Sequence, residues 1–127
     1  MTKEDKKLLL KDLSGRLPYG VKIEVDEAFG SKDVVVLDCF YLNRVKSRLY
    51  IMKPYLFPLS SLTAKQKQEL WDMGWAYILG TLSNERIEFR THFDCRDLID
   101  FFNENHIDYR GLIEKGLAID CTNLNIY

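Results

Sequence analysis

The fold is decided by a stretch that alternates apolar and charged side chains, Val21-Lys22-Ile23-Glu24-Val25-Asp26. Successive side chains of a β-strand point to opposite faces, so this pattern predicts a strand with one buried face. A β-branched run follows, Val34-Val35-Val36-Leu37, which predicts a central strand covered on both faces. Residues 44–51 alternate again and predict a third strand. Three strands joined by short turns favour an antiparallel meander or a small barrel.

Capping patterns predict two helices, with Thr2 and Asp5 before residues 3–13, and Thr63 and Gln66 before residues 64–73. A third helix is predicted between Asp94, as its N-cap, and Asn105. Its apolar side chains recur at i, i+3, i+4 and i+7 and form one face, Cys95, Leu98, Ile99 and Phe102. We expect Leu98, Ile99 and Phe102 to be buried against the sheet.

The remaining segments are predicted as connections and short elements. Pro54 and Pro58 bracket three large apolar residues, which indicates an extended connector pressed onto the core rather than a helix or a central strand. Residues 75–79 and 86–90 are candidates for a hairpin. A short helical turn over 110–115 and a last strand over 117–119 complete the expected α+β fold, a single domain over residues 1–127.

Composition sets the class of protein. The chain has 127 residues, 46% of them hydrophobic and 29% charged, with a formal net charge of −1. These values exclude a disordered chain and a disulfide scaffold, and they leave no strong global field for nucleic acid. The N-terminus lacks the apolar stretch of a secretory signal, and no stretch is long enough to span a membrane. We therefore expect a cytoplasmic protein in which Cys39, Cys95 and Cys121 are reduced thiols.

The predicted third strand carries a candidate binding surface. Arg44, Lys46 and Arg48 are two residues apart, which places them on one face of a strand, and Lys53 and Tyr50 could extend that surface. Basic strands with aromatic side chains are how many small barrels hold single-stranded nucleic acid. Two alternatives stay open. The surface could bind another anionic ligand, or its charges could only be solvated and discourage pairing at a sheet edge.

Tyr109 and Arg110 form a second candidate surface, for a protein partner. Arg110 could bind an anion or a partner's carboxylate. It could instead pair with Asp108 or Glu114 and hold the C-terminal segment in place, which is the interpretation we favour. The ring of Tyr109 is expected to pack rather than to take part in chemistry.

Catalytic and metal-binding motifs are sparse. The chain has no glycine-rich phosphate loop and no Gly-x-Ser-x-Gly turn. One group could hold a metal or pair a thiol with an imidazole: His92, Asp94, Cys95, His106 and Asp108. Its spacing matches no standard site, so we expect no metal, no cofactor and no catalytic residue set.

Three segments carry a resemblance to a known family: residues 8–22 (LLLKDLSGRLPYGVK), 53–63 (KPYLFPLSSLT) and 106–120 (HIDYRGLIEKGLAID). In this order they resemble a family of small uncharacterised proteins from gut Bacteroidetes and their phages or prophages. The segments cover about a third of the chain. The resemblance implies a phage-borne or mobile-element protein, and it brings no activity and no catalytic residues.

Together these observations predict a non-enzymatic protein that acts by binding another protein or by self-association. The alternative from a different class is a small nucleic-acid-binding protein that uses Arg44, Lys46 and Arg48. An enzyme is the third hypothesis, and a deep polar pocket around His92 or His106 would favour it.

Overall fold

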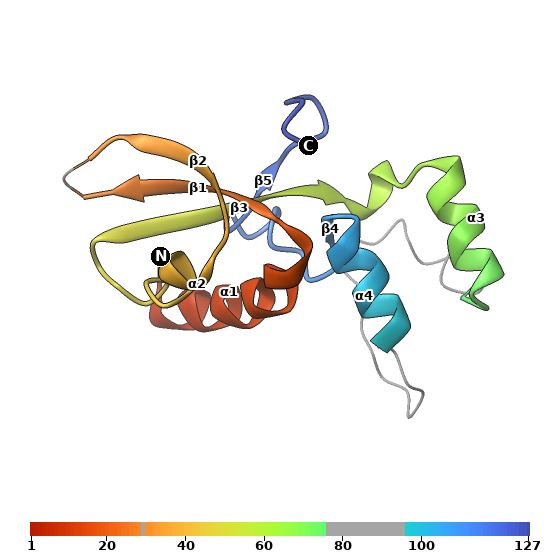
Figure 1. Cartoon of the computed structure of the whole chain (residues 1–127), viewed down its shortest axis with the longest axis horizontal. Coiled ribbons are helices and arrows are strands. Elements are labelled where there is room, and N and C mark those ends of the chain that lie inside the picture. The colour runs from red at the N-terminus through yellow and green to blue at the C-terminus, as the bar shows by residue number, and fades with distance from the viewer. Residues whose placement is uncertain (29, 76–95) are drawn as a thin grey trace.

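The computed structural model describes residues 1–28, 30–75 and 96–127, and within them the fold is α+β, as predicted. The helices are α1 (Lys3–Arg16), α2 (Cys39–Leu42), α3 (Ala64–Asp72) and α4 (Arg96–Glu104), with 3-10 turns at Leu17–Tyr19 and Leu59–Ser61. The strands are β1 (Lys22–Glu27), β2 (Lys32–Val36), β3 (Tyr50–Pro58), β4 (Ile107–Asp108) and β5 (Ile119–Asp120). Figure 1 shows α1 on one side of the sheet and α3 and α4 at the far end of β3.

The sheet is mixed and open. Its order is β2-β1-β3-β4, and β5 also pairs with β3. β1 is antiparallel to both β2 and β3, whereas the two short strands run parallel to β3. Neither of the two predicted arrangements is correct. The described strands do not close into a barrel, and β3 pairs with β1 rather than with β2, so the three strands do not follow one another as a meander.

β1 behaves as its alternation predicts. Ile23 and Val25 are buried, and the charged residues between them are only partly covered. Ile23 and Val25 belong to a cluster with Leu9 and Leu13 of α1, so the helix covers the apolar face of the sheet. A second cluster contains residues of α3, α4 and β4, and Phe57 of β3 packs against it.

The prediction of a central strand at Val34–Leu37 is wrong. β2 is an edge strand, and Val34 and Val36 are 52% and 51% exposed. Val35 alone in this strand packs against the core cluster. The β-branched run therefore reflects strand propensity, while burial depends on which neighbours cover each face.

The strand predicted over residues 44–51 is also wrong. The Asp38 carboxylate accepts a hydrogen bond from the Tyr41 N–H at 3.1 Å and caps α2, so the chain turns through residues 43–46 instead of extending. The strand begins only at Tyr50.

The segment predicted as a connector is instead the middle of the sheet. β3 runs through Pro54 as far as Pro58. The Ala28 N–H donates to the Leu49 carbonyl at 2.9 Å, which fixes the alternation of hydrogen-bonded pairs between β1 and β3. Pro54, opposite Ile23, then falls at a position where the ladder needs no N–H toward β1. On the other side of β3, pairing with β5 begins only at Tyr55. The absence of an N–H at Pro54 therefore removes no hydrogen bond from either ladder.

The helix predictions are largely confirmed. Both capping boxes are present, although α1 continues to Arg16, three residues beyond its predicted end. α3 ends before Gly74, which has a φ of 88°. In α4, Leu98 and Phe102 are fully buried, whereas Ile99 is only half-buried and Phe101 takes its place in the core.

Other predictions fall at or beyond the limits of the described residues. The predicted hairpin lies outside them, apart from Trp75, as do Asp94 and Cys95.

The C-terminal elements differ slightly from the prediction. The segment 112–116 is a hydrogen-bonded turn rather than a helix, and β5 begins two residues later than predicted.

Candidate functional site

The outward side of β2, which we call the open edge, presents unpaired backbone groups. The Leu37 N–H donates to the Val21 carbonyl at 2.9 Å, and this bond sets the hydrogen-bonding alternation along β1 and β2. The N–H and C=O groups of Lys32, Val34 and Val36 consequently point away from β1. No described strand pairs with that side, so the open edge combines three free backbone positions with two exposed valines.

The predicted basic surface is only partly assembled. Arg44, Lys46 and Arg48 lie in turns rather than on one face of a strand, and we call them the basic loop. The Arg44 guanidinium donates to the Phe40 carbonyl at 2.7 Å. It also lies over the Phe40 ring, with its Cζ 3.5 Å from the ring centroid. Lys46 and Arg48 are exposed.

Lys53 and Tyr50 do not extend the basic loop as predicted. Both are half-buried residues of β3. Lys53 lies directly opposite Glu24 of β1, so an acidic neighbour offsets its charge.

Tyr109 and Arg110 are not a joint surface, and the prediction of one is wrong. Tyr109 is 3% exposed, and its ring stacks on Phe102 with centroids 5.6 Å apart. The Arg110 Nε donates to the Asp12 Oδ1 at 3.0 Å. Arg110 therefore does hold the C-terminal segment in place, but through Asp12 rather than through Asp108 or Glu114.

A buried ion network surrounds this contact. Asp12 and Arg16 are both fully buried and lie one turn apart on α1. The Arg16 Nε donates to the Asp12 Oδ2 at 2.8 Å, and its Nη2 donates to the Ile107 carbonyl at 2.7 Å. The Asp12 carboxylate thus receives two guanidinium groups, and the Arg16 guanidinium joins α1 to β4. Our sequence reasoning missed this network, although the i, i+4 spacing of Asp12 and Arg16 is visible in the sequence.

Asp108 also has a structural role. Its two carboxylate oxygens accept hydrogen bonds from the Leu112 and Ile113 N–H groups, each at 2.9 Å, and so hold the turn that follows. Burial raises the pKa of Asp108, and these backbone hydrogen bonds oppose that effect.

A second cluster joins Tyr127 to the sheet. The Tyr127 hydroxyl donates to the Tyr55 carbonyl at 2.7 Å and accepts from the Lys22 N–H at 2.9 Å. It therefore bridges β1 and β3 at the next position along their register. The His106 ring stacks on the Tyr127 ring with centroids 3.8 Å apart. Tyr127 as a whole is 41% exposed, but its hydroxyl is buried, and this burial raises the pKa of the hydroxyl.

This cluster predicts a pH dependence. Burial, with smaller effects from the charges of Arg16 and Lys22, lowers the pKa of His106 from 6.5 to about 4. The unfolded chain therefore binds the proton more readily than the folded chain does. The stability due to neutral His106 is complete above pH 6.5 and is lost as the pH falls toward 4. We expect urea unfolding of the wild type to show this loss.

His106→Asn is the matched variant, because asparagine tolerates the positive φ of 58° at this position. The variant should lose less stability than the wild type between pH 7.5 and pH 5. Equal losses in the two proteins would contradict the role assigned to His106.

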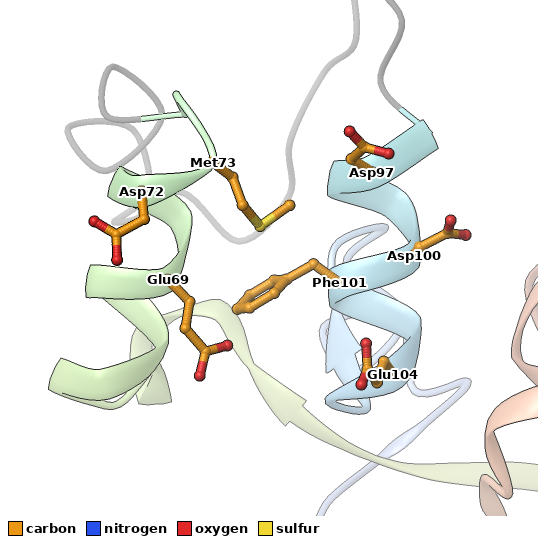
Figure 2. Close-up of a pocket in the computed structure, with 7 residues that line it drawn as sticks. All are labelled: Glu69, Asp72, Met73, Asp97, Asp100, Phe101 and Glu104. Atoms are coloured by element: carbon orange, nitrogen blue, oxygen red, sulfur yellow. The ribbon is translucent and has the colours of Figure 1, made fainter.

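A shallow groove lies between α3 and α4. Figure 2 shows Met73 and Phe101 extending toward each other across it, while Asp72 and Asp100 point away from its centre. Glu69, Asp97 and Glu104 complete the lining. The carboxylates do not converge on one point, as the ligands of a bound cation would. We therefore interpret this groove as a solvated acidic surface.

The candidate metal group is not assembled in the described residues. Within residues 1–28, 30–75 and 96–127, no three His, Cys, Asp or Glu side chains gather as metal ligands would. His92, Asp94 and Cys95 lie outside the described residues. Cys39 is exposed and Cys121 is buried, and burial raises the pKa of Cys121 to about 11. In the part of the chain that is described, no helix has both the length and the apolar character needed to cross a bilayer.

Comparisons with known proteins return nothing that could assign this site. No protein-family model matches the chain, and neither the curated proteins nor the solved structures contain a match. The resemblance to a Bacteroidetes and phage family therefore stays a prediction.

Proposed function

We propose that this chain is a non-enzymatic protein that binds another protein at the open edge, in a phage or mobile-element context. The observation that carries the proposal is the exposure of Val34 and Val36 on a strand whose outward backbone groups are unpaired. Monomeric proteins normally protect such edges with charges, prolines or covering segments. Main-chain hydrogen bonds to an added strand would supply affinity, and the two valines would supply apolar contact.

The experiment removes one outward N–H and leaves the sheet intact. Val34→Pro takes away a donor that faces away from β1, so the ladder between β1 and β2 keeps its bonds. Val34→Thr is the matched control, because it retains the N–H and the β-branched shape. The bait is the full chain, and the prey is a lysate of its native host.

We expect the wild type and Val34→Thr to retain the same discrete protein, and Val34→Pro to retain at least tenfold less of it. Melting temperatures show whether each variant is folded. Equal retention by a folded Val34→Pro variant, or no discrete protein retained by the wild type, would overturn the proposal.

A nucleic-acid-binding function remains the second candidate. One observation favours it: Phe40, a 48% exposed ring, lies beside the basic loop, with Arg44 over it. Bases stack on exposed aromatic rings, while neighbouring basic side chains neutralise phosphates.

The basic loop can be tested by salt dependence. Changing Arg44, Lys46 and Arg48 to Gln should weaken binding to a single-stranded oligonucleotide. It should also flatten the plot of log affinity against log salt by up to about 2, since each single-stranded phosphate contact contributes about 0.7. Lys65→Gln with Lys67→Gln on α3 is the control, since both lysines are exposed and far along the chain. Absence of wild-type binding at low salt would exclude this candidate.

A further inference from the structure

We propose that the occupant of the open edge is the β2 strand of a second copy of this chain, paired antiparallel about a two-fold axis at Val34. The inference rests on the proposed function and names the partner. The two sheets would then form one continuous sheet through the dimer. In Figure 1, β2 is the outermost strand of its sheet, beyond β1.

Backbone geometry restricts the possible registers. The outward groups belong to alternate residues, Lys32, Val34 and Val36. In an antiparallel pair, two residues that face each other at a hydrogen-bonded position exchange both bonds. A two-fold axis at Val34 places it opposite Val34 of the second copy and places Lys32 opposite Val36 of the second copy. All outward groups of both strands are then paired, with about six hydrogen bonds.

The neighbouring registers are worse. An axis at Asp33 would place two aspartates directly opposite each other, and like charges in that position are destabilising. An axis at Val35 would leave the outward groups of Lys32 without a partner. The sequence of β2 therefore selects the register centred on Val34.

The side chains fit a second copy as well. Val34, 52% exposed, would lie against its own equivalent at the axis, and Val36 against the aliphatic part of Lys32. No charged side chain of β2 faces a like charge in this register. The net charge of −1 leaves little repulsion between two copies.

A charge swap at the axis tests this arrangement. Val34→Lys and Val34→Glu each place two like charges opposite each other in a self-paired dimer, whereas an equimolar mixture of the two variants places opposite charges there. Trp71→Lys and Trp71→Glu are the matched controls, because Trp71 is 60% exposed on α3, outside the sheet. Sedimentation equilibrium of purified protein measures the dimer.

We expect the wild type and the Trp71 variants to dimerise with increasing concentration. Each Val34 variant alone should have a dimer dissociation constant at least tenfold higher, and mixing the two should restore dimerisation. A wild type that stays monomeric up to about 1 mM, or Val34 variants that dimerise as well alone as mixed, would overturn the inference.

These outcomes differ from those that test the proposed function. If purified wild type is monomeric while the lysate experiment retains a protein in a Val34-dependent way, the second copy is the wrong partner and the proposed function stands. If the wild type dimerises as described but the retained protein does not depend on Val34, the edge serves self-association alone.

Discussion

Asp12→Ala is expected to lower the free energy of unfolding by about 3–5 kcal/mol, the usual cost of removing one partner from a buried ion pair. Asp12 and Arg16 are both fully buried, and Arg110 donates to the same carboxylate. Without Asp12, the Arg16 guanidinium would be left charged and enclosed, with a second cation beside it. Urea denaturation followed by circular dichroism measures the loss.

Two variants define the origin of this effect. Glu4→Ala removes an exposed acid from the first turn of the same helix, so its effect should be well under that of Asp12→Ala. Replacing Asp12 with Leu and Arg16 with Met together removes both charges, and should cost less than Asp12→Ala alone. A loss of under about 1 kcal/mol in Asp12→Ala, the usual range of a surface ion pair, would show that the network is solvated.

Phe102→Ala is expected to cost about 3–5 kcal/mol, because deletion of a fully buried ring leaves a cavity that the surroundings fill only in part. Phe102 has no exposed surface and lies between Phe101 and Tyr109, with ring centroids 5.9 Å and 5.6 Å away. Thermal unfolding of the variant should show a clear drop in melting temperature.

Ile99→Ala provides the comparison on the same helix. Ile99 is only half-buried at the margin of the same cluster, so its truncation should cost less than that of Phe102. A melting temperature only a degree or two below that of the wild type in Phe102→Ala would contradict the packing of α4 described above.

Features set by residues close in sequence were predictable from the sequence alone. The capping boxes at Thr2 and Thr63 satisfy backbone groups three residues away, and both begin helices as expected. The alternation in β1 likewise reports which side chains face the core. Each of these signals is complete within a short stretch of chain.

Predictions failed where burial depends on distant neighbours. Val34 and Val36 have the composition of a central strand, but no described strand covers their outward edge. Pro54 would disrupt a ladder at most positions of a central strand, and it is tolerated because of its register against Ile23. Neither fact can be read from the residues themselves.

In the candidate sites, too, the predictions failed where the outcome depends on residues outside the pattern that was read. Arg44, Lys46 and Arg48 have the spacing of a strand face, but the local cap at Asp38 starts a helix and then a turn. The partner of Arg110 is Asp12, 98 residues earlier in the chain, so no local pattern could indicate the pair.

The bridge made by the Tyr127 hydroxyl has a consequence for the order in which the molecule is completed during synthesis. Its two partners, Lys22 and Tyr55, are 105 and 72 residues earlier in the chain. A ribosome releases the polypeptide from its N-terminus, so β1, β2 and β3 can pair while later residues are still being added. The bridge between the Lys22 N–H and the Tyr55 carbonyl can form only after Tyr127 emerges, and its phenol then takes the place of a direct peptide contact in the ladder.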